Sequence, residues 1–278
     1  MATSTAILLA CVLTGVASVV GAIVPLVWQP SHRWMQVLLS LIAGVMAGVA
    51  ALDLLPHAIE GMQASHAALH TEACDHDHDH AAHAGLRSVM LWAVGGFLCM
   101  YLLERFVCFH HHEQGDDCCP AGGHGHTMSW IGACSGLTVH ALIAGFGLGA
   151  ATMLEGAEQV AWPGVGMLLA IGLHKPFDGL AIVTLLRRDG RSVSVGWITT
   201  LAYACVTPVG IAVAWAMGGV GGVDVWAAPA VAVTAGLLLC VALSDVLPEL
   251  QMHSHDRLLL SGALVAGVLV AVAASSLH

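Results

Sequence analysis

His174-Lys175-Pro176-Phe177-Asp178-Gly179 stands in the middle of an apolar segment, residues 163–186, that is long enough to cross a lipid bilayer. Three ionisable side chains within six residues are costly there, about 2.5 to 3.5 kcal/mol each, and therefore need a compensating role. His174 and Asp178 are four residues apart, so an imidazole and a carboxylate share one helix face and can bind one cation. The segment thus predicts a metal site inside a membrane-spanning helix.

The same stretch has a second interpretation, in which it is only structural. Lys175 and Asp178, at a spacing of three, can form a buried ion pair that holds the helix against its neighbours. Pro176 removes a backbone donor and bends the helix in either case. Residues elsewhere in the chain have to decide between the two interpretations.

The composition is typical of a protein that crosses the membrane several times. Of the 278 residues, 58% are hydrophobic and only 9% are charged, which excludes a soluble protein. The 32 glycines favour close packing of helices in lipid. The formal charge of −10 comes largely from acidic, histidine-bearing connections, which favours attraction of cations and argues against nucleic-acid binding.

Apolar windows predict an all-α integral membrane protein, a bundle of eight transmembrane helices that forms a single domain over residues 1–278. The first window starts almost at Met1 without a basic region, so we expect a retained helix and no cleaved signal peptide. Arginines gather in the connections on one side, which the positive-inside rule assigns to the cytoplasm. We therefore expect a multi-pass protein of the plasma (inner) membrane with both termini outside. The predicted spans are 5–28, 35–58, 87–109, 129–153, 163–186, 193–217, 227–250 and 257–277.

Two connections, residues 66–83 and 110–126, are rich in histidine. Their mixture of histidine and aspartate cannot form a packed core, but it offers ligands to a transition metal with little geometric constraint. We expect these loops to capture metal; the alternative is a merely soluble linker, which would more usually contain Ser, Lys and Glu. The expected ligands are His76, His78, His80, His110, His111, His112, His124 and His126.

Two stretches of the chain are similar to each other: Asp53-Leu54-Leu55-Pro56-His57 in the second span and Asp245-Val246-Leu247-Pro248-Glu249 in the seventh. Because these spans run in opposite directions, the similarity predicts an inverted repeat of helices 1–3 and 6–8. We expect the acids and their fourth neighbours to bind the ion along its path, although they could instead serve as polar partners at proline kinks. The expected path residues are Asp53, His57, Asp245 and Glu249.

A second internal similarity relates His140-x-x-x-x-Gly145 in the fourth span to His174-x-x-x-x-Gly179 in the fifth. These spans would form a central 4–5 pair in the bundle. His140 has only small apolar neighbours, and a lone histidine in such a place is more often a core residue. With His174 and Asp178, however, it completes two imidazoles and one carboxylate, enough to hold Zn²⁺ or a similar ion with one open position.

At this point the chain resembles the ZIP family of divalent-metal transporters, over essentially all eight spans. The resemblance rests on the histidine-bearing connection after the third span, the histidine motifs of the fourth and fifth spans, and Asp-Val-Leu-Pro-Glu-Leu in the seventh. It implies a metal site near the bilayer centre, often binuclear, and movement of zinc, iron, manganese or cadmium into the cytoplasm. It also implies that His140, His174 and Asp178 are the ligands of the main transport site.

The departures from the family pattern concern the second metal. Ala141 and Ala144 stand where the family usually has a polar residue and an acid, Lys175 replaces an acid or amide, and Thr207 replaces an acid before proline. The ligands expected only of the second metal are therefore missing, and the Lys175 ammonium would stand about where that ion sits. The resemblance thus implies a mononuclear site whose charge balance is tuned at Lys175 and Thr207.

We therefore predict an importer of Zn²⁺, or of a related first-row ion, and not an enzyme. The metal is its substrate, no prosthetic group is expected, and the expected partners are the divalent ion, the lipid bilayer and a second copy in a homodimer. One alternative is a related transporter selective for Ni, Co, Fe or Mn. Another is an intramembrane zinc-dependent hydrolase, in which water on a three-ligand metal is the nucleophile. A metal-binding scaffold without transport is the third.

Overall fold

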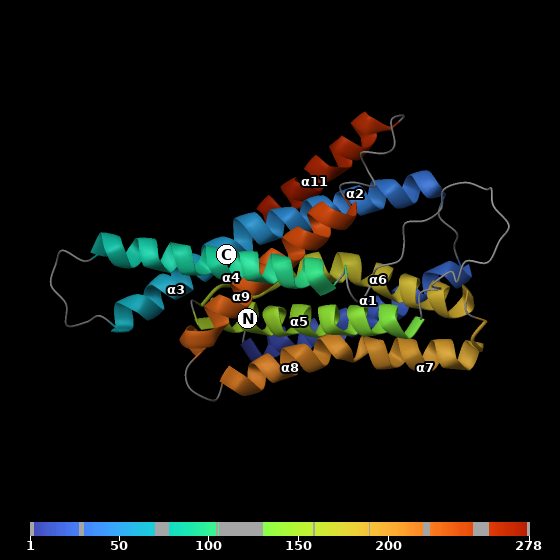
Figure 1. Cartoon of the computed structure of the whole chain (residues 1–278), viewed down its shortest axis with the longest axis horizontal. Helices are drawn as coiled ribbons and strands as arrows, with labels where there is room; N and C mark the ends of the chain where they lie inside the picture. The colour runs from blue at the N-terminus through green and yellow to red at the C-terminus, as the bar shows by residue number, and fades with distance from the viewer. Residues whose placement is uncertain are drawn as a thin grey trace, which may run out of the picture.

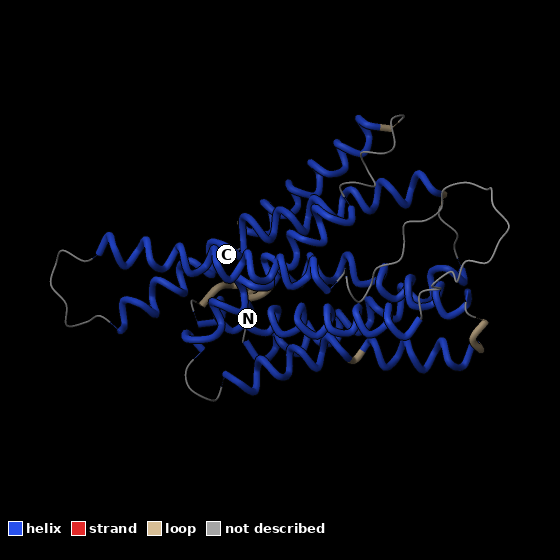
Figure 2. Tube along the Cα trace, in the orientation of Figure 1, coloured by secondary structure: helices blue, strands red, loops and turns tan. Residues whose placement is uncertain are grey.

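The computed structural model describes residues 3–27, 31–69, 78–103, 105, 130–157, 159–188, 190–218, 223–246 and 256–276. Helices make up nearly all of this part of the chain, and it contains no strand (Figure 2). Eight of its helical stretches are long and apolar enough to cross a membrane. The predicted all-α architecture with eight spans is therefore confirmed.

The helices overlap every predicted span, but those on either side of the first histidine-rich connection extend beyond the predicted limits. Five spans are single helices: α1 (Thr3–Val27), α4 (His78–Leu103), α5 (Trp130–Ala157), α6 (Val165–Arg188) and α11 (Arg257–Ser275). The sixth span consists of α7 (Val193–Ala204) and α8 (Val206–Gly218), which meet at Cys205. The second span joins α2 (His32–Val49), the π-helical turn η1 (Ala50–Leu54) and α3 (Leu55–Leu69). The seventh joins α9 (Val223–Cys240) and the π-helical turn η3 (Val241–Val246).

One histidine-rich connection is shorter than the predicted loop 66–83. α3 continues to Leu69 and α4 already begins at His78, so the backbone at His78 and His80 is helical. Alanine is the best helix former, and alanines on both sides of the connection, at 67–68 and 81–82, favour this extension. The other expected loop ligands lie outside the described residues: His76, His110, His111, His112, His124 and His126.

Helix packing follows the predicted inverted repeat. The most extensive contacts pair α2 with α11, α4 with α9, α1 with α6, and α5 with α8. The repeat relates the first, second and third spans to the sixth, seventh and eighth, and α5 to α6. Under this exchange the α2–α11 pair corresponds to the α9–α4 pair. The α1–α6 pair likewise corresponds to the α8–α5 pair. Figure 1 shows α7 and α8 along the lower edge beside α5, and α2 beside α11 in the upper part. The two sets of three spans thus make corresponding helix contacts around the α5–α6 pair.

The two similar Asp-x-x-Pro stretches produce the same backbone irregularity. Asp53 lies in η1, and Asp245 lies in η3. Pro56 has no N–H for the carbonyl of Leu52, and its ring would collide with that carbonyl in a regular α-helix. The preceding turn widens to a π-helical one instead. Each repeat thereby carries an acid at a widened turn inside a span.

Two glycines let the central helices approach their partners closely. A Cβ atom on Gly145 of α5 would overlap the backbone carbonyl of Thr207 in α8, and one on Gly179 of α6 would overlap that of Ser18 in α1. A residue with a side chain cannot be accommodated at such a contact. In each copy of the His-x-x-x-x-Gly pattern, the histidine therefore lies just over one helical turn before a glycine at which two helix backbones are in contact.

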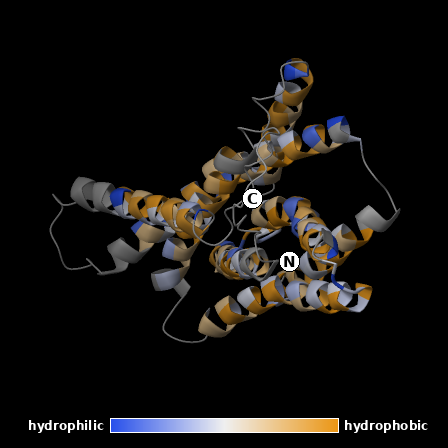
Figure 3. Ribbon diagram, turned by 45° about the vertical axis from the view of Figure 1, so that its right-hand side comes forward, coloured by the Kyte–Doolittle hydropathy of each residue, from blue (hydrophilic) through white to orange (hydrophobic). Residues whose placement is uncertain are grey.

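The outer surface of the bundle is apolar along the helices. Leucine, valine and tryptophan side chains are exposed on most spans, as expected of helices that face lipid. Figure 3 shows hydrophobic residues over the helical lengths and hydrophilic ones towards helix ends. At one end, Arg33 of α2 forms a 2.9 Å ion pair with Asp256, just before α11. Polar side chains in the interior of the bundle are therefore candidates for a functional role.

Candidate metal centre

Two buried histidines of the central helices face each other. His140 of α5 and His174 of α6 have ring centroids 5.8 Å apart, and only 6% and 7% of their surfaces are exposed. Asp178 follows His174 by one turn of α6, and the ligating atoms of all three residues lie within 4.8 Å of one another. Zinc bonds to such nitrogen and oxygen atoms at about 2.0 to 2.2 Å, so small side-chain rotations suffice to close the set around one ion.

The two imidazoles differ in the hydrogen bonding of their Nδ1 atoms. Nδ1 of His174 lies 2.9 Å from the carbonyl oxygen of Ala170. A carbonyl can only accept, so Nδ1 donates and Nε2 keeps its lone pair, the arrangement typical of metal-binding histidines. Nδ1 of His140 is buried and has no hydrogen-bond partner within the described ranges. A buried nitrogen without a partner costs about 1 to 3 kcal/mol, which a bound ion would recover.

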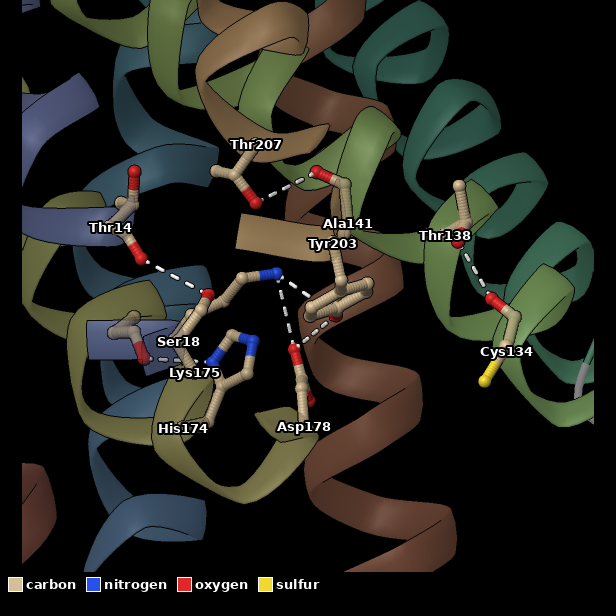
Figure 4. A network of polar contacts seen from close by, with 11 residues as sticks. Thr14, Ser18, Cys134, Thr138, Ala141, His174, Lys175, Asp178, Tyr203 and Thr207 are labelled. Carbon is tan, nitrogen blue, oxygen red and sulfur yellow. Dashed lines mark hydrogen bonds and ion pairs between the residues drawn. The ribbon is translucent and has the colours of Figure 1, made fainter. Parts of the chain in front are cut away.

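Lys175 points into the same interior as Asp178, towards Tyr203 of α7 (Figure 4). Its Nζ atom donates to Oδ2 of Asp178 at 3.2 Å and to the Tyr203 hydroxyl oxygen at 3.0 Å. The Tyr203 hydroxyl in turn donates to the same Oδ2 at 2.7 Å. An ammonium group cannot accept a hydrogen bond, so the tyrosine proton has to point towards the carboxylate. The ion pair considered as an alternative is thus present beside the candidate ligands, and only 1% of the lysine surface is exposed.

Two buried polar residues escaped the sequence analysis. Tyr203 is one of only two tyrosines and lies in an apolar segment, a signal that its hydroxyl needs a partner. No spacing rule relates it to a carboxylate 25 residues earlier. Glu155, near the end of α5, accepts a 2.6 Å hydrogen bond from the amide of Gly164 and thereby fixes the connection into α6.

The positions associated with a second metal contain no ligand set. Ala141 and Ala144 are buried methyl groups on α5. The buried hydroxyl of Thr207 donates to the carbonyl of Ala141 at 3.4 Å, so it joins α8 to α5 one residue after His140 (Figure 4). Thr207 is therefore a neighbour of the site, bound to backbone.

The two described path residues, Asp53 of η1 and His57 of α3, lie away from the two histidines. Asp53 is buried in η1, where its Oδ2 contacts Gly166. Gly166 precedes His174 by eight residues, about 12 Å along a helix axis. His57 donates through Nδ1 to the backbone carbonyl of Asp53 at 2.7 Å. The side chain of Asp245 and all of Glu249 lie outside the described residues.

Sequence comparison relates almost the whole chain to one group of membrane proteins. Residues 2–129 and 109–275 match the family model described as "ZIP Zinc transporter". Mouse "Zinc transporter SLC39A7" is 35% identical over 100 residues, 36% of this chain and 18% of that protein. Mouse "Zinc transporter ZIP4" is 26% identical over 281 residues, 82% of this chain and 40% of that protein. The chain thus spans less than half the length of these curated relatives.

Proposed function

Because this chain belongs to the ZIP family of zinc transporters, we propose that it imports one divalent ion at a time through His140, His174 and Asp178. Family membership supports divalent-metal transport as its general activity. The direction, the preferred ion and the single-ion site are the proposal. One observation carries it: three potential ligands from two central helices converge within 4.8 Å inside the bundle.

The ligand chemistry favours Zn²⁺ as the first substrate. Two imidazole nitrogens and one carboxylate oxygen suit a borderline first-row ion, and three protein ligands leave a fourth position for water or an exchanging ligand. An incomplete ligand set holds the ion less firmly than a structural site would, which suits an ion that has to leave. Ni²⁺, Co²⁺, Fe²⁺ and Mn²⁺ are the competing substrates.

The charges around the site support a single ion. Two divalent ions would bring +4 into an interior whose metal-ligand group contains one carboxylate, Asp178. The Nζ atom of Lys175, 3.2 Å from that carboxylate, adds a further positive charge. Neither Ala144 nor Thr207 offers a carboxylate to offset it. A second ion is therefore unfavourable.

The hydrolase alternative has no support in the described residues. A hydrolase needs a general base within hydrogen-bond reach of a metal-bound water. Asp53, the buried acid that packs on α6, contacts Gly166, about two helical turns from His174. Lys175 is next to the ligands, but its ammonium is engaged by Asp178 and Tyr203.

The proposed orientation follows the arginines. We place the Arg33 end of α2, with its ion pair to Asp256, on the cytoplasmic side of the plasma membrane, with both termini outside. An even number of spans requires both termini on one side. The homodimer stays a prediction.

Flux into sealed vesicles tests the proposed function. The purified chain is reconstituted, its orientation is determined by protease accessibility, and uptake is measured for Zn²⁺, Ni²⁺, Co²⁺, Fe²⁺ and Mn²⁺ in turn. We expect saturable Zn²⁺ uptake towards the Arg33 side. Metal binding without flux would instead indicate a scaffold, and preferred uptake of another ion would replace zinc as the substrate.

The histidine-rich connections are expected to assist capture without being required for transport. Replacing His76, His78 and His80 by asparagine keeps the chain length, and at the start of α4 asparagine has a helix propensity close to that of histidine. The half-saturation concentration for zinc should rise several-fold, because these imidazoles raise the local ion concentration, while maximal flux is unchanged. Initial uptake rates over a range of zinc concentrations measure both quantities. Loss of maximal flux in a well-folded variant would contradict this division of roles.

A further inference from the structure

We propose that Tyr203 is a positioning residue of the metal site: its hydroxyl holds Oδ2 of Asp178 away from the ion, so that the carboxylate binds through Oδ1 alone. The ion is then held by three protein atoms and exchanges readily. This inference rests on the proposed function of His140, His174 and Asp178.

The Tyr203 contact is the strong one on this carboxylate oxygen. Its 2.7 Å oxygen–oxygen distance is the usual one for a hydroxyl donor and reaches the range of charge-assisted bonds, whereas the Lys175 contact is 3.2 Å. Only 4% of the tyrosine surface is exposed, so water has little access to replace it. Release of Oδ2 to a metal ion therefore requires breaking a buried bond to tyrosine.

Two donors on one oxygen decide how Asp178 can bind metal. A carboxylate oxygen has two lone-pair directions, and those of Oδ2 are taken by Tyr203 and Lys175. Oδ1 is left for the ion. Binding through both oxygens would add a ligand atom, strengthen binding and slow release. The tyrosine thereby keeps the coordination number low.

Tyr203 is well fixed for this role. It lies in the last turn of α7, just before the break at Cys205, and α8 is then joined to α5 through Thr207 and Ala141. The Lys175 ammonium also lies over its ring, 4.3 Å from the centroid. Loss of the hydroxyl alone would leave this cation–π contact and the packing in place. Phenylalanine therefore removes only the hydroxyl, together with its bonds to Asp178 and Lys175.

The test compares Tyr203→Phe with Tyr101→Phe in the full chain. Tyr101 is the other tyrosine; it is exposed on α4, and its oxygen accepts from Arg105 at 3.4 Å.

Co²⁺ is the probe, because its visible absorption reports the number of ligands, and the signal of His174→Ala protein is subtracted to remove binding elsewhere. We expect Tyr203→Phe to bind Co²⁺ about tenfold more tightly, since one charge-assisted hydrogen bond no longer competes. Absorption per bound ion should fall as a fifth ligand atom joins, and Tyr101→Phe should match the wild type.

Unchanged affinity and spectrum in Tyr203→Phe would overturn the inference, as would weaker binding, which would mean that the hydroxyl supports the ligand. Tyr203→Met, which also lacks the hydroxyl, serves if the phenylalanine variant is not monodisperse, and the same tightening is expected. Absence of any His174-dependent Co²⁺ signal in the wild type would instead contradict the proposed site, and the role of Tyr203 with it. The two failures are therefore distinguishable.

Discussion

Replacing His174 by alanine is expected to weaken zinc binding at the central site at least about a hundredfold and to abolish saturable uptake. Loss of groups that merely orient a metal ligand costs 10- to 100-fold in affinity, so loss of a ligand itself should cost at least as much. The two remaining ligands include Asp178, one of whose oxygens is already engaged by Lys175 and Tyr203.

Uptake and thermal unfolding with and without zinc measure this effect together. Zinc at 100 times its dissociation constant should stabilise the wild type by about 2.7 kcal/mol and the variant by far less. Thr184→Ala is the matched control, because Thr184 lies exposed on the same helix and donates only to the carbonyl of Ala181. Wild-type uptake and stabilisation in the His174 variant would contradict the proposed site.

Replacing Lys175 by glutamate is expected to raise the number of metal ions at the centre from one to two. The change removes an ammonium and adds a carboxylate beside Asp178, so the interior can balance a second divalent ion. Without metal, two adjacent carboxylates repel, and the variant should unfold at a lower temperature than the wild type. Loss of a buried ionic partner costs about 3 to 5 kcal/mol, which bound metal should offset.

The variant Lys175→Met distinguishes the effect of removing the positive charge from the effect of adding a metal ligand. It removes the ammonium but supplies no oxygen, so it should still bind one ion, more tightly than the wild type. Elemental analysis of metal per chain, corrected with His174→Ala protein, gives the stoichiometry of both variants. One ion in the glutamate variant would mean that Lys175 does not exclude the second ion, and the single-ion proposal would then depend on Ala144 and Thr207.

The spans and the pairing of His140 with His174 could be predicted because they depend on local patterns. Hydropathy identifies a segment that can cross lipid, and a histidine five residues before a glycine recurs in two neighbouring spans. Asp178 follows from its spacing on the same helix as His174. Each of these inferences uses residues within one helical segment or a repeat of it.

What could not be predicted depends on contacts between helices. Tyr203 reaches Asp178 because α7 packs on α6, and no periodicity in either segment encodes that meeting. The widened turn around Asp53 is likewise invisible to hydropathy, which treats a π-helical turn like an α-helical one. The helical start of α4 at His78 is not evident from hydropathy, because charge and histidine end the apolar window whereas alanines continue the helix.

The centre of the molecule is the exception to its twofold design. The exchange that pairs Gly145 with Gly179 also pairs Ala144 with Asp178, since each stands one residue before its glycine. The helix contacts are therefore matched between the two halves, whereas the acid of the metal-ligand group stands on α6. Position 144 is therefore the counterpart of position 178 in the other central helix. An aspartate there would occupy a backbone position equivalent to that of Asp178. A single substitution at position 144 would thus offer the centre a second carboxylate without any change of fold.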